Sequence, residues 1–313
     1  MLHGHDRPPG LALDGMRFAT DAASLTEALP GADVLLVWDF LSAAVEPAWP
    51  AAADLRWVHV ASAGVDRLLF PGLVASDAVL TNSRGVFDRP IAEYVLTLLL
   101  AFAKDLPATL DLQRAGVWRH RETEHVDGRE ALIVGTGSIG RATARLLTAA
   151  GLRVSGVGRT ARRGDPDLGE VYAAERLHDV LPGADFVVVA APLTPQTRGM
   201  FDAAAFRRMK PGARFVNVGR GPIAVEDDLL AALRSGQLGG AGLDVFAEEP
   251  LPPGHPFWAM SQVIVSPHMS GDFVGWLDAL TDLFVRNYRH WWQGRAMLNV
   301  VDKTLGYVPG PAR

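Results

Sequence analysis

The chain of 313 residues contains no cysteine, which excludes disulfide bonds, thiolate metal ligands and a cysteine nucleophile. It also lacks a long apolar run: the longest, 94–103, is too short to cross a bilayer and includes Thr97. The first ten residues hold no apolar segment of the signal-peptide type. A formal net charge of −5 provides no broad basic surface for nucleic acid or anionic lipid. We therefore expect a cytoplasmic protein without nucleic-acid or membrane partners and without a metal site.

What the sequence does contain is an alternation of short apolar runs with helical segments. The length exceeds the ~250 residues at which single cores stop growing, so two domains are expected. Runs at 34–37, 57–60 and 78–80 are typical of buried strands in a parallel sheet covered by helices. A helix opened by Pro90 leads into a second series of strands and helices, typical of a doubly wound dinucleotide-binding domain. This second series has strands at 131–134, 154–157, 186–190, 215–218, 241–245 and 263–265, followed by a long helix at about 272–292.

A glycine-rich turn follows the first strand of this second series. Gly135, Gly137 and Gly140 carry the G-x-G-x-x-G spacing between a β-branched strand and an Ala/Leu-rich helix. In that order they permit a tight turn, close approach of the backbone to a pyrophosphate, and close packing of helix on strand. The phosphates would meet free N–H groups at the helix N-terminus, where Ser138 and Ile139 lie. The alternative is a strand-to-helix turn that binds nothing.

The end of the next strand indicates which dinucleotide is bound. An NAD site usually has Asp or Glu there for the ribose 2′-hydroxyl, but this chain has Gly158 and no acidic residue nearby. Arginines and a hydroxyl would attract a 2′-phosphate. We therefore expect NADP(H) to be preferred, with NAD(H) as the alternative. The residues assigned to the phosphate are Arg159 and Thr160, assisted by Arg162 or Arg163; the competing interpretation is a solvated basic loop.

Three later segments each place an ionisable residue just beyond a predicted strand, where doubly wound sheets bind ligands. They carry Arg220, Glu249 and His268. Reduction of a keto acid needs a cation for the carboxylate and carbonyl dipole, a proton donor for the carbonyl oxygen, and a group that keeps the donor protonated. Arginine, histidine and glutamate fit these roles in that order. Taken singly, each also fits a structural role, as a turn arginine, a surface acid or a packed histidine.

Together these motifs resemble the D-isomer-specific 2-hydroxyacid dehydrogenase family, which includes glyoxylate/hydroxypyruvate reductases and phosphoglycerate dehydrogenases. The family arginine lies in an N-x-x-R-G pattern, matched by Asn217 and Arg220. The family glutamate lies in D-V-F-x-x-E-P, matched by Glu249, and the histidine in P-H-x-x-G, matched by His268. The resemblance covers nearly the whole chain. Three motifs in this order behind a dinucleotide fingerprint are far more specific than any one of them.

The resemblance implies further site residues. In the family, backbone amides of a first-domain loop bind the substrate carboxylate, an aspartate lies near the nicotinamide carboxamide, and strand-end loops run along the cofactor. Arg220 and His268 complete the substrate site. The matching residues are Ser62, Ala63 and Gly64 for the carboxylate, Asp244 for the carboxamide, and Pro192 and Val218 for the loops along the cofactor.

The resemblance also implies an architecture. A Rossmann NAD(P)-binding domain at 99–281 would be inserted into a discontinuous flavodoxin-like substrate domain at 1–98 and 282–313. Family members are usually homodimers, so a homodimer is expected. The sequence departs from the family at its beginning, because before residue 34 only 16–20 looks strand-like. The usual first strand and helix are therefore expected to be absent or rudimentary.

The implied activity is hydride transfer between NADPH, or NADH, and a small 2-keto acid, acting as a glyoxylate/hydroxypyruvate-type reductase. His268 would donate the proton, Arg220 would hold carboxylate and carbonyl, and Glu249 would stabilise the imidazolium. Two alternatives stay open: an NAD-linked phosphoglycerate-type dehydrogenase, and a dinucleotide-sensing corepressor-like protein, which can keep the same three residues. Formate dehydrogenase, another relative, is disfavoured by the Pro267-His268 pair and by its longer chain.

Overall fold

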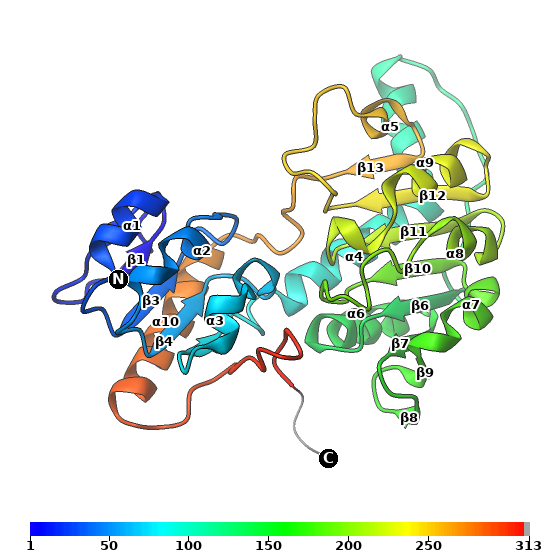
Figure 1. Ribbon diagram of the computed structural model, residues 1–313. Helices are drawn as coiled ribbons and strands as arrows, with labels where there is room; N and C mark the ends of the chain where they lie inside the picture. The colour runs from blue at the N-terminus through cyan, green and yellow to red at the C-terminus, as the bar shows by residue number, and fades with distance from the viewer. Residues whose placement is uncertain (310–313) are drawn as a thin grey trace. The chain divides into compact units, whose positions relative to one another are not determined.

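The computed structural model describes residues 1–309. The chain divides into two compact units (Figure 1): the first comprises Met1–Phe87 with the described part of Phe273–Arg313, and the second comprises Asp88–Asp272. Each unit is built on its own sheet of mainly parallel strands, so the expected fold class of two doubly wound α/β domains is confirmed. The expected boundaries at 98/99 and 281/282 stay a prediction. Among the described residues, no helix has the length and apolar character needed to span a membrane.

The first unit contains a five-stranded parallel sheet in the order β2-β1-β3-β4-β5. This is the flavodoxin-like order, in which the chain reverses its direction of progress beside the first strand. All residues of β3 and β4 are buried, as expected for strands covered on both faces. The strands are β1 (Leu2–His3), β2 (Phe18–Ala19), β3 (Val34–Val37), β4 (Trp57–Val60) and β5 (Val79–Thr81), and the α-helices are α1 (Ala22–Ala28), α2 (Val45–Ala48), α3 (Pro71–Ala75) and α10 (Trp276–Trp292).

The beginning of this unit is reduced, as the sequence indicated. Strand β1 has two residues, and the stretch between β1 and β2 consists of turns and coil without a helix. The two-residue β1 was not predicted, because so short a strand has no periodicity to recognise. Helix α1 begins with a capping box in which Asp21 accepts a hydrogen bond from the Ser24 amide.

The second unit contains an eight-stranded sheet in the order β13-β12-β11-β10-β6-β7-β9-β8, parallel except for β8. The chain starts at β6 and extends in opposite directions through β7 and through β10, so the switch point lies between β6 and β10. Doubly wound sheets bind ligands outside the carboxyl ends of the strands at this point. The strands are β6 (Glu130–Val134), β7 (Arg153–Gly158), β8 (Arg162–Asp165), β9 (Gly169–Ala173), β10 (Phe186–Val189), β11 (Ala213–Asn217), β12 (Leu238–Leu243) and β13 (Val263–Val265).

Six of these strands match the predicted series, and β8 and β9 were missed. Strand β8 has the sequence RRGD, which contains no apolar residue, and β9 has GEVYA, whose three apolar residues were not recognised as a strand. They form because β9 pairs with β7 and β8 pairs with β9, which are interactions between segments that local sequence does not reveal. Strand β8 begins within the segment assigned to the 2′-phosphate, because Arg162 and Arg163 are its first two residues.

The helices of the second unit pack in two groups. Helix α4 packs against α6, and its Leu98 and Phe102 lie against Gly242 and Gly240 of β12, where a side chain would leave too little room. Helices α7, α8 and α9 share one apolar core with the sheet. The helices are α4 (Asp88–Ala103), α5 (Leu106–Arg114), α6 (Ser138–Ala149), α7 (Leu177–Val180), α8 (Ala203–Arg208) and α9 (Glu226–Arg234). Helix α7 is one short turn flanked by 3₁₀ turns, and α10 begins four residues later than expected.

Candidate active site and cofactor-binding loop

The three ionisable residues predicted for catalysis all belong to the second unit. Arg220 follows β11, Glu249 lies in the loop after β12, and His268 follows β13. These strands are parallel neighbours, so their carboxyl ends meet at one edge of the sheet. The geometry therefore brings together residues that are up to 48 positions apart in the sequence.

His268 and Glu249 form a hydrogen-bonded pair. His268 Nδ1 lies 2.8 Å from Glu249 Oε2, and the Phe246 amide donates to the other carboxylate oxygen at 2.9 Å. Burial alone would raise the pKa of Glu249, but the hydrogen bonds from His268 and Phe246 and the charge of Arg220 hold it below its usual value. The carboxylate is therefore ionised near neutral pH, with the His268 ring in contact with it.

The loop that carries His268 is fixed by Asp244. Its buried carboxylate accepts hydrogen bonds from the Ser266 hydroxyl at 2.6 Å and from the amides of Met269 and Ser270 at 2.9 and 3.0 Å. The His268 amide donates to the Asp244 carbonyl at 2.9 Å, and His268 itself adopts φ 53°. The predicted cofactor residue Asp244 thus holds the backbone on both sides of the histidine.

Asn217 fixes the turn that presents Arg220. Its side-chain oxygen accepts a hydrogen bond from the Gly219 amide, and its side-chain nitrogen donates to the Arg220 carbonyl, both at 3.0 Å. Gly221 then approaches the loop after β12, where an added Cβ would lie 1.9 Å from the Phe246 carbonyl carbon. These contacts explain the N-x-x-R-G spacing, since asparagine closes the turn and glycine permits the packing.

The glycine loop has the properties that a dinucleotide site requires. Gly135 has φ 110°, and an added Cβ would lie 2.6 Å from the backbone of Ala190. A Cβ on Gly140 would lie 1.9 Å from the Gly135 carbonyl oxygen, so only glycine lets α6 pack here. Gly137 directly precedes α6. A Cβ added to it would have no atom within 4 Å, so the backbone at this point of the turn is open. Ser138 donates to Asp88 at 3.0 Å, and Ile139 lies in the same first turn. Free amides at the N-terminus of α6 suit a pyrophosphate.

The segment after β7 also fits the predicted cofactor preference. Gly158 ends β7, and an added Cβ there would lie 2.8 Å from the Thr136 hydroxyl, so Thr136 occupies the space where an acidic side chain would begin. Arg159 and Thr160 follow directly and are exposed. Arg163 is also exposed and lies 3.7 Å from Glu170.

Arg162 is held by a buried aspartate. Asp165 accepts two hydrogen bonds of 2.8 Å from Arg141 on α6 and lies 3.2 Å from Arg162 Nε. The hydrogen bonds from Arg141 hold the pKa of Asp165 well below its usual range, against the effect of burial. This cluster ties β8 to the helix that starts at the glycine loop, and so anchors the connection containing Arg159 and Thr160.

The other predicted cofactor residues also lie at the carboxyl edge. Pro192 is exposed just after β10, and its carbonyl accepts from the Thr197 hydroxyl at 2.7 Å. Val218 is buried just after β11, and its amide donates to Val189 at 3.0 Å. Together with the glycine loop, they follow the strands on both sides of the switch point.

The predicted substrate loop, Ser62–Gly64, belongs to the first unit and follows β4. Each of its carbonyls has a partner inside that unit: the Ser83 amide for Ser62, the Asn82 side chain for Ala63, and the Ser62 hydroxyl for Gly64. Ala63 and Gly64 are only half-buried. Carbonyls that are all occupied leave the amides as the groups that this loop can offer, which suits an anion.

Comparison with known proteins agrees with this site. Residues 96–270, which include the glycine loop and all three ionisable residues, match the model of the D-isomer specific 2-hydroxyacid dehydrogenase NAD-binding domain. The chain belongs to the D-isomer specific 2-hydroxyacid dehydrogenase family. It is therefore an NAD(P)-dependent oxidoreductase. Among curated relatives, glyoxylate/hydroxypyruvate reductase A of Serratia proteamaculans is 32% identical over 259 residues, covering 81% of this chain and 82% of that protein.

Solved structures of the family are also similar. The NADPH-dependent glyoxylate/hydroxypyruvate reductase of Sinorhizobium meliloti, solved with NADP and sulfate, has a TM-score of 0.83 and 33% identity, covering 95% of this chain and 93% of that one. A D-isomer specific 2-hydroxyacid dehydrogenase of Xanthobacter autotrophicus, solved with NADPH and MES, has a TM-score of 0.81 and 31% identity, covering 98% and 100%. The family resemblance inferred from three short motifs is confirmed.

Sequence reasoning missed the residues that support the site. Neither Asp165 nor Asn82 was predicted to belong to the site. Neither has a local signal, because Arg141 lies 24 positions before Asp165 and Ala63 lies 19 positions before Asn82. The one hint in the sequence of an ion-pair cluster was that Asp165 and Asp167 follow three arginines within the segment 159–167.

Proposed function

We propose that the protein reduces a small 2-keto acid of the glyoxylate or hydroxypyruvate type to a D-2-hydroxy acid, with NADPH as the preferred cofactor. The observation that carries the proposal is the 2.8 Å contact of His268 with Glu249. The charge of Arg220 acts on the same carboxylate and helps to lower its pKa. The names of the Serratia and Sinorhizobium relatives support the substrate class. The NADP and NADPH bound in the Sinorhizobium and Xanthobacter structures support the cofactor.

Each of the three residues has one role in this mechanism. When bound, the reduced nicotinamide supplies the hydride for C2 of the keto acid. His268 acts as general acid through Nε2, because Nδ1 faces Glu249. Glu249 stabilises the imidazolium and fixes the orientation of the ring. Arg220 offers a planar fork that matches the substrate carboxylate and polarises the carbonyl.

The cofactor preference rests on the segment after β7. Gly158 provides no carboxylate to repel a 2′-phosphate, and Arg159 and Thr160 are exposed beside it. The contact of Arg162 with Asp165 fixes the start of β8, which limits the movement of the three residues between β7 and β8, Arg159 and Thr160 among them. The role proposed for Ser62, Ala63 and Gly64 is to offer backbone amides to the substrate carboxylate. It is supported by their carbonyls, which all accept hydrogen bonds within the first unit.

The test is the initial rate of NADPH and of NADH oxidation with glyoxylate, hydroxypyruvate, pyruvate and phenylpyruvate. We expect turnover with glyoxylate or hydroxypyruvate, and a kcat/KM at least about tenfold higher with NADPH, the equivalent of one lost charge-assisted hydrogen bond. Preference for NADH would refute the assignment of Arg159 while leaving the catalytic residues standing. Absence of turnover with all four acids would contradict the proposed reaction, and cofactor-dependent capture of a partner protein would then favour a sensor.

A homodimer belongs to the same proposal. In the second unit, Trp118 is fully exposed and follows Val117, which is 44% exposed, in the segment after α5. An apolar pair of this kind is typical of a surface that another chain covers. Sedimentation velocity should show a dimer that Trp118→Lys weakens, whereas a wild-type monomer would contradict it. The cytoplasmic location stays a prediction, which cell fractionation would check.

A further inference from the structure

A second carboxylate–imidazole pair lies in the second unit, outside the family motifs. Glu226 Oε1 lies 2.9 Å from His255 Nε2, and their side chains are 22% and 18% exposed, close to the values of 18% and 25% for Glu249 and His268. Glu226 is the first residue of α9, and His255 precedes the 3₁₀ turn Pro256–Ala259. Neither residue has a role in the mechanism above.

Glu226 holds the loop that carries Glu249. Its second oxygen, Oε2, accepts a hydrogen bond from the Ala247 amide at 3.0 Å. The preceding amide, that of Phe246, donates to Glu249. Two consecutive backbone amides therefore donate to two different carboxylates, and both ends of the segment 247–255 are attached to Glu226. Glu249 lies inside this segment.

The hydrogen bonds of the pair have one consistent direction. The Phe257 amide points at His255 Nδ1 at 3.3 Å, so Nδ1 is the acceptor and the ring proton lies on Nε2, facing Glu226. The imidazole also packs on the Phe257 ring, with 4.6 Å between centroids. A carboxylate can accept from both His255 and Ala247. A glutamine cannot, because its amide nitrogen would face one of these two donors.

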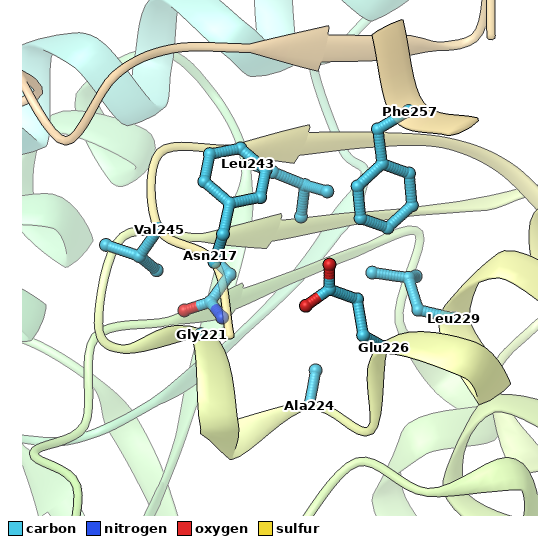
Figure 2. A pocket seen from close by; sticks show the side chains of 9 residues that line it. Asn217, Gly221, Ala224, Glu226, Leu229, Leu243, Val245 and Phe257 are labelled. Atoms are coloured by element: carbon cyan, nitrogen blue, oxygen red, sulfur yellow. The ribbon is translucent and has the colours of Figure 1, made fainter. Parts of the chain in front are cut away.

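The surroundings of Glu226 strengthen these contacts. Figure 2 shows its carboxylate pointing into a small hollow with Leu243 and Phe257 on one side and Leu229 and Ala224 on the other. Glu226 is the one ionisable residue among those that line this hollow. Hydrogen bonds to a charged group are stronger in apolar surroundings, and removing one partner is correspondingly costly.

The same loop supports Arg220. Gly221 lies against the Phe246–Ala247 backbone so closely that no Cβ could be accommodated. The turn that presents Arg220 and the loop that presents Glu249 therefore share one contact, and Glu226 binds the loop next to it. A shift of this loop would move Glu249 relative to both His268 and Arg220.

We propose that Glu226 is a positioning residue for the reaction: with His255 it fixes the Phe246–Ala247 backbone and thereby the place where Glu249 meets His268. The inference rests on the proposed function of Glu249 and His268. Its physical basis is that displacement of a catalytic group by about 1 Å can cost up to about 100-fold in rate.

The test compares Glu226→Gln with Asp227→Asn, which removes a carboxylate from the same turn of α9 at an exposed position. We expect Glu226→Gln to lower kcat by about tenfold with little change in the KM for NADPH, and to cost less than about twofold in a Glu249→Gln background. Asp227→Asn should retain the wild-type kcat. Equal losses in both backgrounds would show that Glu226 does not act through Glu249, and would overturn the proposal.

A measurement independent of turnover separates this inference from the proposed function. The ring ¹H–¹⁵N signals of His268, assigned by their loss in His268→Gln, should move in Glu226→Gln and stay in place in Asp227→Asn. His255→Phe keeps the packing on Phe257, removes the donor to Glu226, and should move the same signals to a smaller extent. Unchanged His268 signals in Glu226→Gln or, if that variant does not fold, in His255→Phe would overturn the inference, whether or not the wild-type enzyme reduces keto acids.

Discussion

His59 of the first unit and His268 of the second both have hydrogen-bonding partners, but the two rings have opposite surroundings. His268 lies just beyond a strand of the second unit, half-buried, with the ionised Glu249 as its partner. His59 lies within β4 of the first unit, fully buried, with the hydroxyls of Thr81 and Ser83 at 2.7 and 3.4 Å. Just beyond a strand, a charged side chain can contact an imidazole ring that remains accessible. In the middle of a covered sheet the partners are neutral, because burying a charge there is costly.

The neutral groups around His59 form hydrogen bonds with one another. Trp57 Nε1 donates to the Thr81 hydroxyl at 2.8 Å, which can donate in turn to His59 Nδ1. Burial lowers the pKa of His59 to about 3. We therefore expect His59 to contribute to the stability of the first unit and His268 to take part in the proposed reaction, and the following experiments test that division.

The largest effect is expected at His268. His268→Ala should lower kcat by about two to four orders of magnitude, because it removes the proton donor and not the fold. The exposed His120, changed to Ala, is the matched control and should retain wild-type turnover. Steady-state kinetics with glyoxylate and NADPH, beside circular dichroism of both variants, would check this. Near-normal turnover of His268→Ala would show that His268 is not the proton donor.

The next largest effect is a pH dependence of stability from His59. Its folded pKa of about 3 lies below the unfolded value near 6.5, so the unfolded state takes up the proton first as the pH falls. Stability from the neutral ring is complete above pH 6.5 and declines by about 1.4 kcal/mol per pH unit below it. Urea unfolding followed by tryptophan fluorescence should show a loss of about 2 kcal/mol between pH 6.5 and 5.

His59→Gln supplies the reference for that measurement, because it cannot titrate while its amide can still form hydrogen bonds. The pKa of the buried His3 is also lowered, so the difference between wild type and His59→Gln is the quantity to compare. An equally steep pH dependence in both proteins would assign the titration to a residue other than His59.

A smaller effect is expected where the second unit uses charge to fix backbone. Asp165→Asn should lower the ratio of kcat/KM for NADPH over NADH by about tenfold, since the anchor of Arg162 and of the neighbouring phosphate segment weakens. Asp167→Asn is the control, because Asp167 contacts Arg141 and Arg145 but not Arg162. A drop of equal size in both variants would point to Arg141 and away from the phosphate segment.

The smallest effect is expected where the first unit uses neutral groups to fix backbone. Asn82→Ala removes the 2.6 Å hydrogen bond to Ala63 and should raise the KM for the keto acid about fivefold, the equivalent of ~1 kcal/mol, with the KM for NADPH unchanged. Asn299→Ala, which removes the hydrogen bonds to the Asn82 and Arg84 carbonyls, should act in the same direction and more weakly. An unchanged KM for the keto acid in both variants would contradict a role of the loop Ser62–Gly64 in substrate binding.

The sequence alone predicted the fold class, which the structure confirms, and the members of the candidate site. Glycine spacing has local steric causes, so the loop at Gly135 could be recognised without a structure, and apolar runs predicted six strands of the second sheet. Because a residue just beyond a parallel strand must lie at the carboxyl edge, Arg220 and His268 could be grouped from strand order. The partners that position them could not be grouped in this way.

Only the tertiary structure showed that Asp244 holds the His268 loop, that Asp165 anchors β8, and that Glu226 reaches the loop of Glu249. These contacts join segments roughly 20 residues or more apart, or depend on strands without an apolar pattern, such as β8. A hydrogen bond needs its two atoms within about 3 Å of each other in a defined direction, and sequence spacing sets neither across a turn and a strand. Apolar periodicity predicted most of the helices and strands, while packing and strand pairing decided which side chains meet and where β1, β8 and β9 form.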